Sequence, residues 1–186
     1  MCIRDSPTGI CLLKENLEAQ LSIAYQDQEI FKVAEKFKPA IIGIDAPLSF
    51  PARGGLRACD RKLIAMKIRV LSPLLGGMRK LTQRAIRLKD RFEAQNMKVI
   101  ECFPGAARRI LKLPGKKESG EMAVEALAKL GVKIGKTTPS IHEIDATLVA
   151  LTAKLYLEGL AEPVGNREGQ IVIPKPEALK RLARKI

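Results

Sequence analysis

Hydrophobic and polar positions in the first part of the chain follow a strand, strand, helix pattern. Residues 8–13 and 19–25 are short apolar segments separated by polar turn material, which predicts a β-hairpin. Over residues 28–37 the apolar positions recur at helical spacing, and Pro39 ends that helix. Residues 40–45 form an apolar run between prolines, typical of a strand buried on both faces.

The rest of the chain alternates helical patterns with two more strands. Residues 98–103 and 171–173 predict strands, and residues 164–169 are turn-rich. Helical spacing predicts helices near residues 58–70, 79–95, 106–113, 121–130 and 140–159, and a basic helical tail over 175–186. The longest helix begins at Ser140, where Glu143 completes a capping box, and Gly159 ends it. This order predicts an α/β fold, a mixed sheet with an antiparallel hairpin and parallel strands flanked by helices.

Length and composition narrow the class of protein. A chain of 186 residues with 46% hydrophobic content is typical of one globular domain, and we place that domain at residues 7–174. The chain has no run of about 18 apolar residues, which excludes a membrane-spanning helix and a membrane role. With five Phe, two Tyr and no Trp, a nucleic-acid surface built on aromatic stacking is disfavoured.

Positive charge is concentrated in one part of the chain. The formal net charge is +13, and residues 53–91 hold twelve basic residues against two acidic ones. Eight of the twelve are arginines, which suit forked contacts to phosphate, so DNA or RNA is the predicted partner. The candidate nucleic-acid-binding residues are Arg53, Arg57, Arg61, Lys62, Arg79, Lys80, Arg84 and Arg87. The alternative is an ordinary solvated basic face.

The four cysteines form no CxxC pair, and the chain has no signal peptide. Reduced thiols in the cytoplasm are the simplest interpretation. With a single histidine and no paired cysteines, a structural zinc site is disfavoured.

Three carboxylates in apolar surroundings are the candidate chemistry. Asp45 ends one predicted strand, Glu101 lies in another, and Asp145 lies on the longest helix, where His142 shares its face at i, i+3. Converging carboxylates would hold Mg²⁺ or Mn²⁺ for phosphodiester hydrolysis, so all four residues are candidate catalytic residues and the three acids candidate metal ligands. Each also has a structural interpretation. Asp45 would cap the following turn, and Glu101 would pair with an arginine such as Arg108 or Arg109. Asp145 would be a first-turn residue favoured by the helix dipole, and His142 would be a satisfied surface group.

Four motifs carry a resemblance to a known family. They are Ile-Gly-Ile-Asp-Ala-Pro (42–47), Gly-x-Arg-x-Cys-Asp (55–60), Glu-Cys-Phe-Pro-Gly-Ala (101–106) and Pro-Ser-x-His-Glu-x-Asp-Ala (139–146). Together they resemble the domain of unknown function 429 family, over about residues 7–174. The resemblance implies a ribonuclease H-like fold and a metal-dependent nuclease, with Asp45 and Asp145 as metal ligands supported by Glu101 and His142.

The first six residues do not fit this pattern. Met-Cys-Ile-Arg-Asp-Ser back-translates to a sequence similar to the transposon end used in sequencing-library preparation, so we exclude residues 1–6 from the fold. The resemblance implies an opening strand with a catalytic Asp just before the Thr8-Gly9 strand. We therefore expect a domain that lacks its first strand and is inactive as written.

Three function classes remain. The leading hypothesis is a metal-dependent nuclease acting on DNA or RNA. The second is a nucleic-acid-binding module without cleavage. The third is a small-molecule phosphotransferase. That function would need a Gly-rich phosphate-binding loop on the first hairpin, and Thr8-Gly9 matches such a loop only in small part. The segment 131–137 does not have the spacing of a nucleotide-binding loop.

Overall fold

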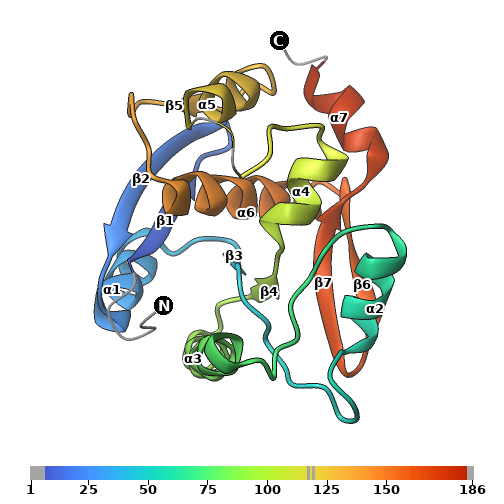
Figure 1. The fold of residues 1–186 in the computed structure, drawn as a ribbon. Helices are drawn as coiled ribbons and strands as arrows, with labels where there is room; N and C mark the ends of the chain where they lie inside the picture. The colour runs from blue at the N-terminus through green and yellow to red at the C-terminus, as the bar shows by residue number, and fades with distance from the viewer. Residues whose placement is uncertain (1–6, 117, 119, 184–186) are drawn as a thin grey trace.

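The predicted hairpin and the helix after it are present. In the computed structural model, which describes residues 7–116, 118 and 120–183, β1 (Thr8–Leu13) pairs antiparallel with β2 (Glu18–Ala24), and α1 (Asp27–Phe37) follows (Figure 1). The short strand β5 (Lys133–Ile134), which the pattern did not indicate, joins β2 in parallel. The first six residues, which we excluded from the fold, lie outside the described part of the chain.

A parallel pair of strands forms the centre of the molecule. β3 (Ile42–Ile44) pairs with β4 (Val99–Glu101), both shorter than predicted. The prediction that β3 is buried on both faces is wrong, because its three residues are only partly buried. The edge of β3 away from β4 borders a cleft, and this leaves the strand accessible.

The last strands form a second antiparallel hairpin. β6 (Ala161–Asn166) pairs with β7 (Gly169–Pro174), and a bridge between Cys102 and Val172 links β7 to the end of β4. The prediction of a turn over residues 164–169 is wrong for most of that segment, because the turn is confined to the residues between Asn166 and Gly169. Pairing with β7 extends β6 despite its weak strand pattern.

The predicted helices are present with shifted ends. They are α2 (Ala58–Ala65), α3 (Gly76–Glu93), α4 (Pro104–Ile110), α5 (Gly120–Ala128), α6 (Ile141–Leu157) and α7 (Pro176–Ala183). The capping box of α6 is confirmed, since the Ser140 amide donates to Glu143 Oε2 at 2.8 Å and the Glu143 amide donates to Ser140 Oγ at 3.3 Å. Residues 184–186 of the predicted tail lie outside the described chain. No described helix is both long and apolar enough to cross a lipid bilayer.

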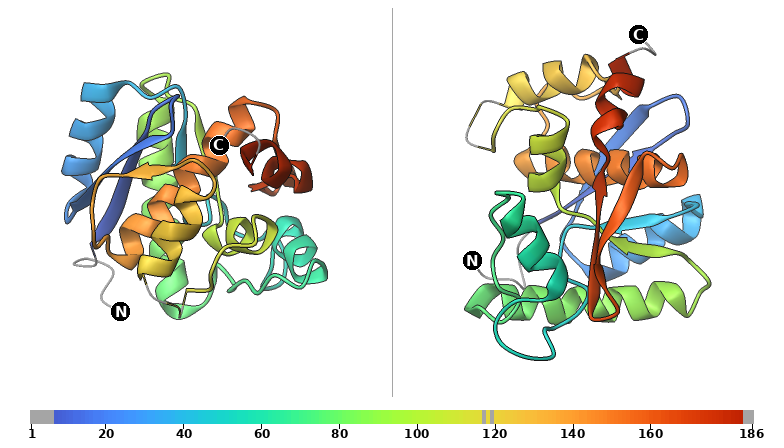
Figure 2. Two further views of the ribbon diagram at one scale, coloured as in Figure 1. Left: turned by 90° about the horizontal axis from the view of Figure 1, so that it is seen from above. Right: turned by 90° about the vertical axis from the view of Figure 1, so that its right-hand side faces the viewer.

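Helix α6 is the centre of the core and contacts all three groups of strands, through β1 and β2, through β3, and through β6 and β7 (Figure 2). A Cβ at Gly9 would lie 2.1 Å from the His142 carbonyl oxygen, and one at Gly43 would lie 2.5 Å from Val149 Cγ1. Glycine at these two positions therefore lets β1 and β3 approach the same helix closely. On the other side of β3 and β4, Phe31 of α1 and Phe92 of α3 pack together with a ring separation of 4.6 Å.

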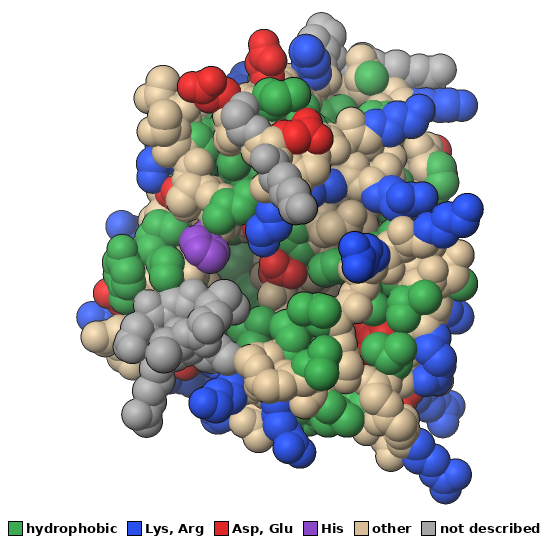
Figure 3. All heavy atoms as spheres, in the orientation of Figure 1, with side chains coloured by type: hydrophobic (Ala, Val, Ile, Leu, Met, Phe, Trp, Pro, Cys, Tyr) green, Lys and Arg blue, Asp and Glu red, His purple; other side chains and the backbone are tan. Residues whose placement is uncertain are grey.

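A large cleft separates β1 from β3, which are not paired with each other among the described strands. The cleft has a volume of about 1280 Å³, and every residue of β1 and β3 lines it. Helix α6 forms one wall, and α1 and α3 form the other, mostly with apolar side chains. Figure 3 looks onto a hollow in this face of the molecule, where acidic, basic and histidine side chains meet.

We expect a strand added ahead of Pro7 to fill this cleft. A turn and an apolar strand joined to β1 would find free strand edges on both sides and apolar walls above and below. Hydrogen exchange of the β1 and β3 amides should slow by about tenfold or more, which corresponds to about 1.4 kcal/mol. A Gly/Ser extension of equal length is the control, and equal exchange in the two proteins would contradict the prediction.

Candidate active site

Two carboxylates from distant parts of the chain meet at one end of the cleft. Asp45 follows the carboxyl end of β3, and Asp145 lies in the second turn of α6; both line the cleft. They lie close enough for the negative charge of Asp145 to act on the carboxyl of Asp45. We call Asp45 and Asp145 the acid pair.

Asp45 is the unpaired member of the acid pair. Within residues 7–116, 118 and 120–183, its carboxylate makes no hydrogen bond or direct ion pair with another side chain. The side chain is accessible from the cleft, but surrounding protein still removes it from bulk water. This desolvation, followed by the charge of Asp145, raises the pKa of Asp45 to about 7, while the positive charge of Lys116 opposes the rise.

Asp145 is buried and held by two cations. Arg108 Nη2 of α4 lies 3.1 Å from its Oδ1, and Lys116 Nζ lies 2.6 Å from its Oδ2. Arg108 also donates from Nη1 to the Pro114 carbonyl at 2.8 Å, which fixes the start of the segment that carries Lys116. The sequence pattern did not indicate either partner of Asp145.

His142 lies one turn before Asp145 on α6 and lines the same cleft. The side chain is partly exposed, and the backbone carbonyl of the residue packs against Gly9 of β1. His142 thus lines the same cleft as the acid pair, and its part in the site stays a prediction.

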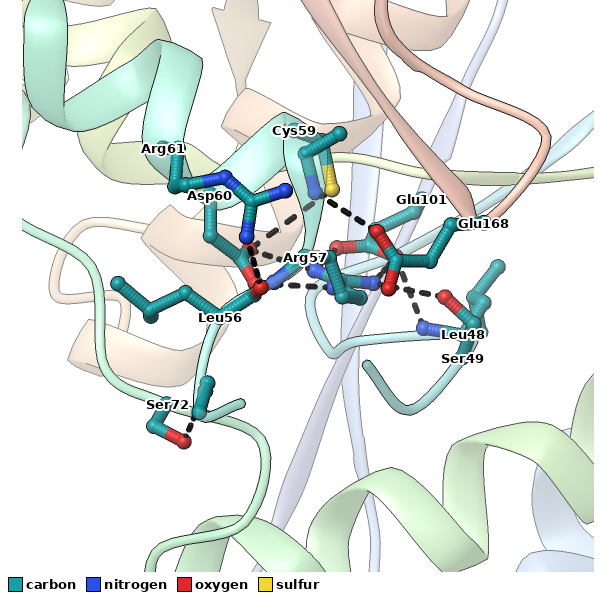
Figure 4. A network of polar contacts seen from close by, with 12 residues as sticks. Leu48, Ser49, Leu56, Arg57, Cys59, Asp60, Arg61, Ser72, Glu101 and Glu168 are labelled. Carbon is teal, nitrogen blue, oxygen red and sulfur yellow. Dashed lines mark hydrogen bonds and ion pairs between the residues drawn. The ribbon is translucent and has the colours of Figure 1, made fainter. Parts of the chain in front are cut away.

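Glu101 belongs to a separate, buried network (Figure 4). Its carboxylate accepts two hydrogen bonds of 2.7 Å from the Arg57 guanidinium, and its Oε2 also accepts from the Leu48 amide at 2.8 Å. The same guanidinium donates to Asp60 at 2.8 and 3.0 Å. The alternative that Glu101 pairs with an arginine is therefore confirmed, but the partner is Arg57 rather than Arg108 or Arg109. Both oxygens of Glu101 are thus engaged, although its charge still reaches Asp45.

Arg57 corrects the set of predicted nucleic-acid contacts. It is 1% exposed, between α2, β4 and the loop after β3, so its guanidinium cannot reach a phosphate on the surface. Burial by itself would lower the pKa of Arg57. The hydrogen bonds to Glu101 and Asp60 have the larger effect and raise the pKa of Arg57 above its usual value. The role of Arg57 in this structure is to hold the loop between β3 and α2.

The remaining predicted phosphate contacts differ in accessibility. The exposed members are Arg53, Arg61, Lys62, Arg79, Lys80 and Arg87. Arg84 is partly buried instead, because its Nε donates to Asp27 Oδ1 at 2.7 Å and its guanidinium donates to Thr8 Oγ1 at 3.2 Å. This pairing ties α3 to the starts of β1 and α1. The exposed arginines of α3 are therefore the better candidates for phosphate contact.

Comparison with known proteins places the chain in a family. The family model described as "Protein of unknown function (DUF429)" matches residues 5–169. The chain belongs to the DUF429 family. No curated protein and no solved structure matches it. The resemblance that the four motifs carry is thus confirmed at the level of the family.

In this DUF429 chain the candidate metal ligands reduce to two. Within the described residues, no group of three or more His, Cys, Asp or Glu side chains is arranged to hold a metal ion. The acid pair nevertheless fits the donor set of Mg²⁺, which proteins commonly bind through one or two carboxylates, with water and substrate phosphate as the other ligands. Because no side chain in the described part of the chain pairs with Asp45, its oxygens fit this role.

Sequence reasoning missed the two basic residues that form ion pairs with Asp145 in this DUF429 site. Arg108 lies in a short helix directly after the Glu-Cys-Phe-Pro-Gly-Ala motif, and its position there was a usable signal. Lys116 lies in a loop with no distinguishing pattern. Glu168 was also missed; its carboxylate accepts from the Ala58 amide at 3.0 Å and from the Ala52 amide at 2.7 Å, so it caps the start of α2.

Proposed function

We propose that the chain is a metal-dependent nuclease of ribonuclease H-like fold that hydrolyses phosphodiester bonds in DNA or RNA. The observation that carries this proposal is the acid pair, two carboxylates one hundred positions apart that meet in a large cleft beside the strongly basic helix α3. The antiparallel β1–β2 hairpin and the parallel β3–β4 pair, covered by α6 on one side and by α1 and α3 on the other, support the fold assignment.

Asp45 and Asp145 are the residues that would hold Mg²⁺ or Mn²⁺. A bound ion would supply a water of lowered pKa and offset the charge of the scissile phosphate. Arg108 keeps Asp145 oriented through its ion pair and its bond to the Pro114 carbonyl. Since the pKa of Asp45 is raised to about 7, a proton competes with the metal ion for this carboxylate near neutral pH.

The other residues of the cleft have distinct roles in this proposal. His142, one turn from Asp145, is placed to orient the attacking water or to accept its proton. Glu101 acts through Arg57, by fixing the loop that follows Asp45, rather than as a ligand. Arg79, Lys80 and Arg87 of α3 are exposed and provide the positive surface for the phosphate backbone.

A cleavage assay tests the proposal. The strand-extended protein, in which a turn and an apolar strand from another DUF429 member are joined ahead of Pro7, is incubated with linear and branched DNA and RNA in Mg²⁺, Mn²⁺ or EDTA. Cleavage that depends on the metal ion is expected. Equal cleavage in EDTA, or an Asp145→Ala protein as active as the parent, would overturn the mechanism.

A nucleic-acid-binding module without cleavage is the second candidate function. The specific observation in its favour is that cations of the protein already neutralise two of the three predicted catalytic carboxylates: Arg57 pairs with Glu101, while Arg108 and Lys116 pair with Asp145. Binding that is retained with no cleavage under any metal condition would favour this candidate.

Salt dependence tests the proposed surface for both functions. Replacing Arg79 and Arg87 together by Ala should lower the affinity for duplex DNA and reduce the slope of log affinity against log salt by about 2, since each phosphate contact contributes about 0.9. The control replaces Lys129 and Lys133 by Ala, two exposed lysines near α5 and β5, far from α3 in Figure 1. Fluorescence anisotropy between 50 and about 200 mM salt measures the slope. Equal slopes in the two variants would exclude α3 as the contact surface.

We also propose a cytoplasmic location. The described cysteines, Cys11, Cys59 and Cys102, are free thiols. Burial raises the pKa of Cys59 to about 12 and that of Cys11 to about 11, so these thiols are unreactive.

A further inference from the structure

The side chain of Lys116 is largely exposed and forms an ion pair with one member of the acid pair. Its Nζ lies 2.6 Å from Asp145 Oδ2, and its charge also acts on the carboxyl of Asp45. Its ammonium group thus contacts one carboxylate of the acid pair and carries a positive charge that also reaches the other. The segment that carries it begins after the Pro114 carbonyl, to which Arg108 is bonded.

The two cations on Asp145 differ in how firmly they are held. The Arg108 side chain is 8% accessible and is fixed by a second hydrogen bond, whereas the Lys116 side chain is 63% accessible. An ion pair that is exposed on one side contributes little net free energy, because water and salt replace it readily. Lys116 can therefore leave Asp145 while Arg108 stays in place.

A divalent cation and an ammonium group cannot share one carboxylate oxygen, because like charges at contact distance repel strongly. We propose that Lys116 is a tethered cation that occupies the acid pair in the free protein and is displaced when a divalent metal ion binds there. This inference rests on the proposed function, since it takes the acid pair as the metal site. It assigns Lys116 as the residue that lowers the apparent metal affinity.

Binding of Mn²⁺ to the full chain, followed by electron paramagnetic resonance, tests the inference without any measurement of cleavage. Lys116→Met should bind Mn²⁺ about fivefold more tightly than the parent, because the competing charge is gone. Lys116→Arg keeps the charge and should bind like the parent. Lys112→Met, a change at an exposed lysine four positions away, is the matched control and should also bind like the parent. Thermal melts establish that every variant is folded.

Equal or weaker Mn²⁺ binding by Lys116→Met would overturn the inference, as would the absence of Mn²⁺ binding by both proteins. These outcomes are separable from failure of the proposed function. Tighter binding by Lys116→Met, together with a strand-extended protein that cleaves no nucleic acid, would support the tethered cation and reject the nuclease. Equal Mn²⁺ affinities, together with metal-dependent cleavage by the strand-extended protein, would reject the tethered cation and support the nuclease.

Discussion

Asp45→Asn is expected to reduce metal-dependent cleavage by the strand-extended protein by about 100-fold or more, without loss of thermal stability. Removing one preorganised electrostatic group from an active site typically costs a factor of about 100 to 1000. Asparagine has nearly the shape of aspartate, and Asp45 makes no ion pair or hydrogen bond with another described residue, so the fold loses no contact. Cleavage rates measured beside thermal melts separate the two effects.

The pH dependence of stability gives this prediction a second readout. The pKa of Asp45 is raised from 3.8 to about 7, so the folded state opposes its ionisation. The free energy of unfolding of the parent should therefore fall, relative to that of Asp45→Asn, as the pH rises from about 4 to about 7, and the difference should stay constant above that. Melting temperatures of the two proteins in EDTA measure the difference. A difference that does not change with pH would contradict the desolvation of Asp45 in the cleft and the effect of the Asp145 charge on it.

Asp145→Asn is the informative comparison. It should also abolish cleavage, but it weakens the ion pairs with Arg108 and Lys116 and leaves the buried Arg108 without a charged partner. A lower melting temperature is expected for this variant and not for Asp45→Asn. If both variants cleave at the parental rate, the acid pair is not the active site.

Arg57→Ala is expected to destabilise the fold by about 3–5 kcal/mol, the usual result of breaking a buried ion pair by removing one partner. The change leaves Glu101 and Asp60 buried, 6% and 2% exposed, without their shared cation. For a domain of this size the melting temperature should fall by about 10 °C or more. Calorimetry or circular dichroism measures it.

Two variants show whether the effect comes from the buried charges. Arg53→Ala removes an exposed arginine of the same loop and should change the melting temperature little. Adding Glu101→Gln to Arg57→Ala removes one of the stranded charges and should recover part of the lost stability. If Arg57→Ala melts like the parent, the network in Figure 4 does not hold the loop after β3.

Local sequence signals were reliable where one segment decides the outcome. The capping box at Ser140 and Glu143, the helical spacing of α1 and the strand pattern of β1 each predicted an element that is present. Partner-dependent elements were not predicted, since β5 and β6 are strands only through pairing with β2 and β7. Pairing energy between distant segments leaves no mark on the local pattern.

The sequence by itself determined the family, the mixed α/β class, and the presence of carboxylates at the ends of apolar segments. Only the tertiary structure decided how those carboxylates are used. Asp45 and Asp145 meet in a cleft, whereas Glu101 is bound by Arg57, a residue that the charge pattern had assigned to the surface. The physical reason is that a charge is free or paired according to the groups that surround it in space, and these come from α2, α4 and loops far away in the sequence.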